Sequence, residues 1–291
     1  MIWTVTFNPS RDMTFVLDGP LEPGSIQVAC SIYARSGGKG NNVARVVRRL
    51  GQPVGAVGFY GGATGELVGS GLQEQGIEVL GEPIAGETRI CLTIVGSGGS
   101  EITEIREKGP PVPPAAAERL LRRLLERVQR EDWVTLSGSL PPELPASVWA
   151  DWVRALNPRC RGVLVDTGAE NLRAAISARP LVMVPNRDEW RASGLSVTDS
   201  VVVTEGANGV TCYPTPGVVR RLRPPKVAVA NTVGAGDAFL GGMVDGLSRG
   251  ESWERALVWA VAVAAASVTS PGVADVDPLL AQSLVPQVVV E

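Results

Sequence analysis

Residues 231–239 combine a polar loop, three small residues and a carboxylate, directly before a segment that is expected to be helical. Gly234, Ala235 and Gly236 would let a ligand approach the backbone closely. Their N–H groups would lie at the positive end of the helix dipole, which suits an anion such as a transferring phosphoryl group. Asp237 could then accept a proton from an attacking hydroxyl, as a general base does in kinases. Helix capping alone explains these residues about equally well.

Lys39 stands among three glycines in the segment 36–42, and the chain contains only two other lysines, Lys108 and Lys226. The spacing matches neither the phosphate-binding pattern G-x-x-x-x-G-K-[ST] nor the dinucleotide-binding pattern G-x-G-x-x-G. The segment could still place backbone donors and one ammonium against a phosphate or a sugar. A glycine turn with a solvated lysine is the alternative.

Asn186 and Glu189 follow an expected strand and place an amide and a carboxylate on one side of a turn or helix start. Such a pair suits Mg²⁺, directly or through water molecules. A helix N-cap with a capping-box glutamate fits the two residues equally well. The segment 204–209 follows another expected strand, and it either borders a nucleotide or forms only a turn.

The absence of histidine excludes whole classes of chemistry. A Ser-His-Asp triad, a Cys-His dyad, an imidazole base or a histidine-bound metal cannot exist within this chain. Acid–base chemistry must therefore come from carboxylates, lysine, tyrosine or cysteine. The four cysteines are far apart and form no Cys-x-x-Cys pair, which excludes zinc ribbons and dithiol redox motifs.

The composition predicts a globular protein without a nucleic-acid or membrane partner. The formal net charge is −3, so the charge balance does not favour a nucleic-acid surface. The N-terminus is typical of a first strand and not of a signal peptide, and the most apolar run, residues 257–268, is too short to cross a bilayer. Buried free thiols are typical of a reducing compartment, so we expect a cytoplasmic protein.

Apolar runs with strand character alternate with segments of helical periodicity along most of the chain. The expected strands are residues 1–7, 54–60, 133–136, 163–166, 181–184 and 201–204. The expected helices are residues 43–50, 66–75, 115–130, 146–156, 170–178, 187–192, 235–248 and 253–268. This alternation predicts an α/β fold with a central, mostly parallel sheet covered by helices on both faces. In such folds ligands bind beyond the carboxyl ends of the strands.

Two β-rich stretches, residues 15–33 and 89–105, do not fit that alternation. Within the second stretch, segments 89–95 and 101–105 are joined by glycine and serine at 96–100, which is a hairpin pattern. We interpret both stretches as a small sheet that projects from the edge of the main domain. A set of irregular edge hairpins is the alternative.

Taken together and in order, these segments resemble the PfkB branch of the ribokinase-like carbohydrate kinases. The resemblance is closest to the 1-phosphofructokinase and tagatose-6-phosphate kinase group, and it covers nearly the whole chain. Its most specific part is Thr-Val-Gly-Ala-Gly-Asp at 232–237, and the other matching motifs lie at 6–12, 37–45, 88–89, 101–105, 137–141 and 185–189. The resemblance implies a single ribokinase-like domain over residues 1–291, with a β-sheet lid made by approximately residues 13–35 and 86–107.

The resemblance also implies roles for individual residues. Asp237 is the expected general base, and the residues expected to form an anion hole are Gly234, Ala235 and Gly236. The residues expected to bind sugar hydroxyls are Asp12, Gly38 and Asn41, with Asn42 as an alternative to Asn41. Those expected to receive a substrate phosphate are Lys39, Arg89 and Ser139. Those expected to border ATP are Asn186, Thr204, Gly206 and Gly209, and Mg²⁺ is expected to be held through water by Asn186 and Glu189.

The activity implied by this resemblance is ATP-dependent phosphorylation of a ketohexose phosphate. Fructose 1-phosphate, converted to fructose 1,6-bisphosphate, is the first expected acceptor. Tagatose 6-phosphate, fructose 6-phosphate and a free sugar are the alternatives. A sugar- or nucleotide-binding protein without catalysis is a hypothesis of another class, and a homodimer formed through the lid is a further expectation.

Four positions depart from the family pattern in ways that affect charge. Ser25 and Gln27 occupy places in the lid that are often basic, and Val184 stands where a lysine usually precedes Pro-Asn. Arg106 stands where the lid motif usually has asparagine, and it could restore positive charge. These departures leave the kinase interpretation in place and leave the acceptor open.

Overall fold

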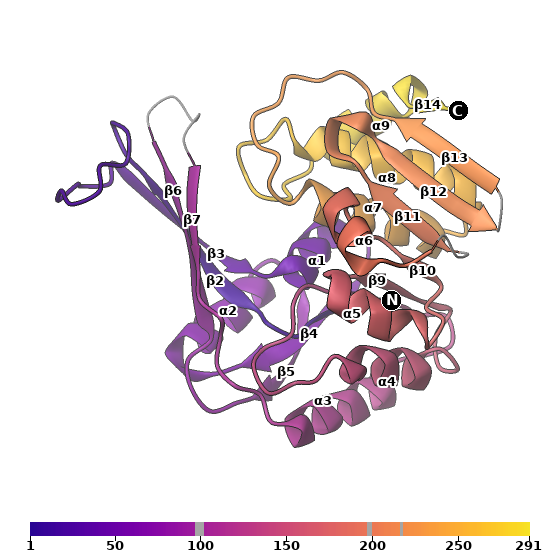
Figure 1. The fold of residues 1–291 in the computed structure, drawn as a ribbon, viewed down its shortest axis with the longest axis horizontal. Coiled ribbons are helices and arrows are strands. Elements are labelled where there is room, and N and C mark those ends of the chain that lie inside the picture. The colour runs from indigo at the N-terminus through magenta and orange to yellow at the C-terminus, as the bar shows by residue number, and fades with distance from the viewer. Residues whose placement is uncertain (97–101, 197–199, 216–217) are drawn as a thin grey trace.

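A large sheet of ten strands lies at the centre of the computed structural model, which describes residues 1–96, 102–196, 200–215 and 218–291 (Figure 1). In spatial order its strands are β5 (Glu78–Pro83), β4 (Val54–Tyr60), β1 (Ile2–Thr6), β8 (Trp133–Ser137), β9 (Gly162–Asp166), β10 (Val182–Met183), β11 (Val201–Thr204), β12 (Val210–Thr215), β13 (Val218–Arg223) and β14 (Val289–Val290). The strands from β5 to β11 are parallel, whereas β12, β13 and β14 are antiparallel to their neighbours. The predicted mostly parallel sheet is therefore confirmed.

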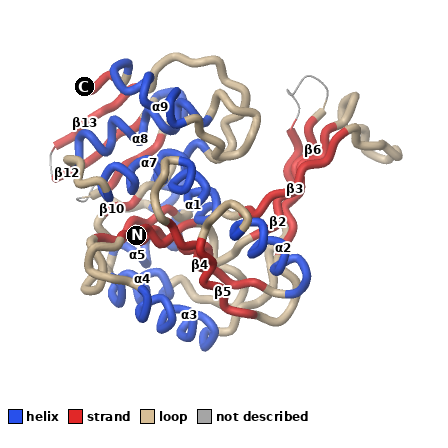
Figure 2. The backbone as a smooth tube through the Cα atoms, turned by 180° about the vertical axis from the view of Figure 1, so that it is seen from behind, coloured by secondary structure: helices blue, strands red, loops and turns tan. Residues whose placement is uncertain are grey.

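Helices cover both faces of this sheet (Figures 1 and 2). The helices on one face are α3 (Pro114–Arg127), α4 (Ser147–Leu156), α5 (Ala169–Ile176) and α6 (Arg187–Ser193). Those on the other are α1 (Lys39–Arg49), α2 (Gly62–Gln73), α7 (Ala235–Ser248) and α8 (Trp253–Ser267), and α9 (Pro278–Leu284) packs on α8. Short helices η2 (Gly206–Asn208) and η3 (Val285–Gln287) complete the described helical elements. Within the described residues, no helix is long and apolar enough to cross a membrane.

The local sequence explains why the central elements form where they do. All five residues of β9 are buried, as expected for a parallel strand covered on both faces. In α1, Val43 and Val47 repeat at helical spacing on the buried side, and the helix ends before Gly51, whose φ is 89°. On the opposite side of the sheet, the rings of Phe7 and Trp149 meet edge to face at 5.1 Å and fill the core beneath α4.

A second, smaller sheet projects from the main body (Figures 1 and 2). Its strands, in spatial order, are β3 (Ser31–Gly37), β2 (Ser10–Val16), β6 (Arg89–Val95) and β7 (Ile102–Arg106), and we call it the lid sheet. The pair β2–β6 is parallel, and the other two pairs are antiparallel. The predicted projecting sheet is thus present. The predicted turn over 97–100 and the first residue of the second predicted strand, Glu101, lie outside the described residues.

The strand character predicted over residues 15–33 is wrong in its middle. β2 ends at Val16 and β3 begins at Ser31, and residues 17–30 form an extended loop. Two prolines and two glycines, at positions 19–24, interrupt strand pairing there because proline lacks a backbone donor and glycine favours turns. The sequence interpretation also missed β5, β12, β13, β14 and α9.

Candidate active site

A cavity of about 1130 Å³ lies between the lid sheet and the carboxyl ends of β8, β9, β10 and β11, and the first turn of α7 forms part of its wall. This is the place where an α/β sheet is expected to bind ligands. The residues predicted to be functional that line the cavity are Asp12, Gly38, Lys39, Asn42, Arg89, Ser139, Asn186, Glu189, Thr204, Gly206, Gly209, Gly234, Ala235, Gly236 and Asp237. Asn41 is the one predicted site residue that does not line it.

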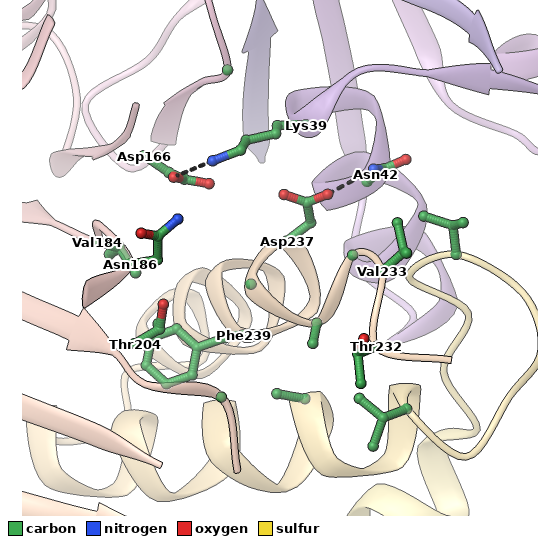
Figure 3. A pocket seen from close by; sticks show the side chains of 18 of the residues that line it. Lys39, Asn42, Asp166, Val184, Asn186, Thr204, Thr232, Val233, Asp237 and Phe239 are labelled. Carbon is green, nitrogen blue, oxygen red and sulfur yellow. Dashed lines mark hydrogen bonds and ion pairs between the residues drawn. The ribbon is translucent and has the colours of Figure 1, made fainter. Parts of the chain in front are cut away.

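Asp237 lies in the first turn of α7 and is 94% buried, with 6% of its surface exposed. Asn42 Nδ2 donates a hydrogen bond of 2.6 Å to its Oδ2 atom (Figure 3). Burial and the nearby carboxylate of Asp166 raise the pKa of Asp237 to about 7, against the opposing effects of Lys39 and Asn42. A carboxylate that titrates near neutral pH is well suited to accept a proton from a hydroxyl.

A left-handed turn at Gly234 brings the start of α7 into the cavity wall. Gly234 has a φ of 81°, and a Cβ there would lie 2.8 Å from the backbone nitrogen of Ala274, so only glycine fits. The N–H of Ala235 donates to Thr232 O at 3.2 Å. The N–H groups of Gly234 and Gly236 have no acceptor among the described residues, so they are available to an anion.

Arg45 fixes the orientation of Asn42 from the next turn of α1. Its guanidinium donates to Asn42 Oδ1 and to the carbonyl oxygen of Ser36. Burial and the charge of Arg35 lower the pKa of Arg45 to about 10, which leaves it charged at neutral pH. Because Arg45 occupies the amide oxygen, the NH₂ group of Asn42 must face Asp237.

Lys39 crosses the cavity from the start of α1 and meets two carboxylates. Its Nζ atom lies 3.0 Å from Asp166 Oδ1, as drawn in Figure 3, and 3.4 Å from Glu189 Oε1. Burial alone would lower the pKa of Lys39, but Asp166, Glu189 and Asp237 together hold it above its ordinary value. The ammonium is therefore charged, and it lies near the expected base and the expected metal ligand.

Asn186 and Glu189 form the capping box that the sequence left as one of two interpretations. The Asn186 side chain accepts from the N–H of Glu189 at 2.8 Å, and Glu189 Oε2 accepts from the N–H of Asn186 at 2.9 Å. Both residues also line the cavity, so capping does not exclude a role with a ligand. The cap fixes Glu189 with its Oε1 atom toward Lys39.

Asp12 reaches the cavity from β2 of the lid sheet. Ser10 Oγ donates to its Oδ1 atom at 2.6 Å. Burial raises the pKa of Asp12, with that hydrogen bond and nearby arginines opposing the rise. Gly37 lies beside Asp12 on β3, and a Cβ there would come within 2.1 Å of the carboxyl carbon. Glycine is therefore required where the strand passes this carboxylate.

Arg89 lies at the base of the lid sheet and is partly occupied by backbone oxygens. Its Nε and Nη2 atoms donate to Asn8 O at 3.2 and 2.9 Å, and its Nη1 atom donates to Glu107 O at 3.2 Å. Asn8 in turn donates to Ser139 Oγ at 3.5 Å. Arg89 and Ser139 both line the cavity, and their shared contact with Asn8 places them close together.

The remaining wall of the cavity is largely apolar and lies below Asp237 in Figure 3. Phe239 and Thr204 are labelled there. Further apolar lining residues include Val227, Val229, Val261, Ala264, Ala265 and Val268. Gly206 and Gly209 border the same part. A flat aromatic group such as a nucleotide base could pack its apolar faces against these side chains.

Asn41 and Asn42 are both buried, but they differ in whether they line the cavity. Asn41 is fully buried, and its side chain donates to Gly37 O at 2.7 Å and accepts from Thr6 Oγ1 at 3.3 Å. Asn42 is the neighbour that faces the cavity. The structure thus favours Asn42 over Asn41 as a residue that can touch a ligand.

Two residues at this site were missed from the sequence. Asp166 ends a strand that was predicted, and its carboxylate position at the carboxyl end of a parallel strand was a usable signal. Arg45 follows Asn42 by three residues on α1, a spacing that puts both on one side of the helix. Nothing in the sequence indicates that the guanidinium bonds the amide and not solvent.

Comparison with known proteins gives consistent relatives. The profile of the family described as pfkB family carbohydrate kinase matches residues 19–279. A 1-phosphofructokinase of Escherichia coli strain K12 is 32% identical, over 94% of this chain and 93% of that protein. Among solved structures, phosphofructokinase-2 from Escherichia coli in complex with potassium superposes with a TM-score of 0.90 at 24% identity, covering 98% of each chain. A ribokinase from Thermotoga maritima superposes with a TM-score of 0.76 at 20% identity, covering 98% of this chain and 99% of that one.

Proposed function

Because the chain belongs to the pfkB family of carbohydrate kinases and has the ribokinase-like fold, we propose that it transfers the γ-phosphoryl group of ATP to fructose 1-phosphate. The product would be fructose 1,6-bisphosphate. The 32% identity to a 1-phosphofructokinase supports a sugar-phosphate kinase. The observation that carries the catalytic part is the buried Asp237 at the start of α7, beside free N–H groups and facing the lid sheet.

In the proposed reaction, an acceptor hydroxyl lies between Asp12 and Asp237. Asp237 takes the hydroxyl proton while the oxygen forms a bond to the γ-phosphorus and the bond from that phosphorus to the bridging oxygen of ADP breaks. The N–H groups of Gly234 and Gly236 donate to the phosphoryl oxygens as charge moves toward ADP. Lys39 offsets the negative charge gathered in the cavity.

The donor set at the cavity fits Mg²⁺ bound jointly with ATP. Within the described residues, no group of three or more His, Cys, Asp or Glu side chains could hold a metal ion alone. Mg²⁺ commonly takes one or two carboxylates, with water and substrate phosphates as its other ligands. Glu189, together with Asn186 and through water, would hold it at this site. The ion would supply charge neutralisation for the phosphates.

The outer face of the lid sheet supports a proposal of dimerisation. Alternation along the strands places Ile32, Ile90 and Ile105 on the face opposite Asp12. They are 54%, 39% and 55% exposed, which is high for isoleucine side chains gathered on one sheet face. We propose that a second copy of the chain covers this face. Light scattering on the parent and on Ile32→Lys tests the proposal, and a monomeric parent would contradict it.

We propose a cellular location on the basis of the cysteines and the proposed use of ATP. The four cysteines are free in this structure. A kinase that uses ATP and keeps its thiols reduced belongs in the cytoplasm, and this is the compartment we propose. Localisation of a fluorescent fusion checks it.

The acceptor is tested by comparing kcat/KM for fructose 1-phosphate, fructose 6-phosphate, tagatose 6-phosphate and free fructose. We expect fructose 1-phosphate to be used best, because cationic side chains on the lid sheet face the sugar end of the cavity. Equal or better use of free fructose would overturn the sugar-phosphate proposal and favour a kinase for an unphosphorylated sugar. No turnover of any sugar, with binding retained, would favour a protein that only binds its ligands.

A further inference from the structure

The cationic side chains at the sugar end of the cavity differ in how much binding capacity they retain. Lys39 is held between the carboxylates of Asp166 and Glu189. Arg89 donates from three nitrogens to backbone oxygens, so much of its guanidinium is already used. An acceptor phosphate therefore needs another donor if it is to be bound strongly by charge-assisted hydrogen bonds.

Arg106 is the remaining lid cation that lines the cavity, and its position is set by strand register. Asp12 of β2 pairs with Cys91 of β6, and Cys91 pairs with Arg106 of β7. These residues lie side by side on the same face of the lid sheet, with the Cα atoms of Asp12 and Arg106 about 10 Å apart across two strand spacings. Arg106 is close enough to interact electrostatically with the Asp12 carboxyl. Burial raises the pKa of Asp12, and the positive charge of Arg106 is one of the effects that oppose this rise.

Arg106 keeps most of its donors free. Its side chain is 66% exposed, and Glu104 is its ion-pair partner within the described residues. The two residues are two apart on one strand, so both side chains point into the cavity. This guanidinium is thus held at the cavity by a single neighbouring carboxylate.

We propose that Arg106 binds the phosphate group of the acceptor sugar and that Glu104 holds the guanidinium in place until the acceptor arrives. The proposal rests on the sugar-phosphate kinase function proposed above. A guanidinium matches the oxygens of a phosphate with parallel N–H donors, which asparagine at this position could not do. On binding, the phosphate replaces Glu104 as the partner of Arg106, and no covalent bond changes.

Glu104 has an opposite effect on the same ligand. Its carboxylate competes for Arg106 and repels the phosphate, so it weakens acceptor binding. Removing the charge of Glu104 should therefore strengthen binding, while removing that of Arg106 should weaken it. A purely structural role for this pair would give the two variants effects of the same sign.

The test compares the parent with Arg106→Gln and Glu104→Gln, using fructose 1-phosphate as the probe. Arg122→Gln is the matched control, since Arg122 is an exposed arginine on α3 outside the cavity. For Arg106→Gln we expect the KM for fructose 1-phosphate to rise about tenfold or more, with the KM for ATP unchanged. For Glu104→Gln we expect the KM for fructose 1-phosphate to fall severalfold, and for Arg122→Gln we expect this KM to stay at the parent value.

Binding of fructose 1-phosphate without ATP, measured by calorimetry, separates the two proposals. If the parent binds and phosphorylates a sugar phosphate but Arg106→Gln has the parental KM and dissociation constant, the role of Arg106 is overturned and the kinase function stands. If the parent neither binds nor phosphorylates any sugar phosphate, both proposals fail. Weaker acceptor binding in Glu104→Gln would also count against the role of Arg106.

Discussion

The large sheet and the lid sheet differ in how firmly their residues are held. In the large sheet, β1, β8 and β9 are buried along their whole length, and helices cover both faces. In the lid sheet, β7 is exposed at every described residue, and α2 and the start of α1 pack against the base of the sheet. Asp237, proposed for proton transfer, stands on the rigid part, and Arg89 and Arg106, proposed for binding the acceptor phosphate, stand on the open part.

Three of the four positions that depart from the family pattern lie in the open part, and the exception is Val184, which is buried directly after β10. A substitution on an exposed strand with few neighbours changes stability little, so recognition residues there are free to vary. Arg106, Ser25 and Gln27 all lie in the lid sheet or its connecting loop. In contrast, Asp237, Asn42 and Gly234 lie where backbone and side-chain contacts leave little choice.

The largest expected effect is on the rigid side of this comparison, at Asp237. Asp237→Asn preserves size but removes the base, so kcat should fall by about 10²–10⁴-fold. The fold should not be weakened. Because burial raises the pKa of Asp237 in the folded state, its stabilising contribution is present at low pH and is lost as pH rises through about 7. The variant should therefore be at least as stable as the parent at pH 8.

Kinetics and thermal unfolding of Asp237→Asn at pH 8 check both parts. A decrease in kcat of less than tenfold would show that Asp237 is not the base. A large loss of stability would show that the carboxylate is structural, as a helix-capping residue would be.

The second prediction compares one core residue with one lid residue. Trp149 is fully buried against Phe7, so Trp149→Ala should lower the free energy of unfolding by about 3–5 kcal/mol. Ile102 on β7 is 52% exposed, so Ile102→Ala should change the free energy of unfolding by less than about 0.5 kcal/mol. Urea denaturation at one protein concentration measures both. Similar losses would mean that the lid sheet is as tightly integrated as the core.

Sequence patterns predict the rigid region well and the lid less well. The bounds of β4, β11 and α7 are predictable to the residue, since apolar runs or helical periodicity end at glycine or polar residues there. The loop 17–30 is not predictable in this way, because its isolated apolar residues Ile26 and Val28 give strand character but are almost fully exposed. Local pattern cannot show that a segment lacks a neighbour to pair with.

The candidate site shows the same limit. Asp237 and the small residues before it are recognisable because their chemistry is local. The choice between Asn41 and Asn42 cannot be made from local sequence, because it depends on which side of α1 faces Thr6 and which side faces Asp237. Lys39 forms ion pairs with Asp166 and Glu189, which are 127 and 150 positions away in the sequence, and no spacing rule predicts such contacts.

The third prediction concerns the Mg²⁺ ion that we propose to bind beside Glu189. Glu189→Gln keeps an oxygen able to accept from the N–H of Asn186, so the capping box should survive, but the charge is lost. We expect the Mg²⁺ concentration for half-maximal activity to rise roughly tenfold. Asp188→Asn is the control, since Asp188 is exposed in the same turn of α6 and does not line the cavity. The same Mg²⁺ midpoint in Glu189→Gln and the parent would argue against a metal-linked role for Glu189.

The smallest expected effect is a shift in pH dependence caused by Asn42. The Asn42 hydrogen bond favours the ionised form of Asp237, and Arg45 fixes the amide that makes it. Asn42→Ala should therefore raise the pKa of Asp237 above its parental value of about 7. Because the base must be ionised to act, the rise of kcat/KM with pH should move to higher pH. The phosphates of the substrates titrate equally in both enzymes, so the difference between the two profiles reports on Asp237 alone. Unchanged profiles with a raised acceptor KM would mean that Asn42 contacts the sugar without tuning the base, and recognition would then extend from the lid sheet into the rigid region.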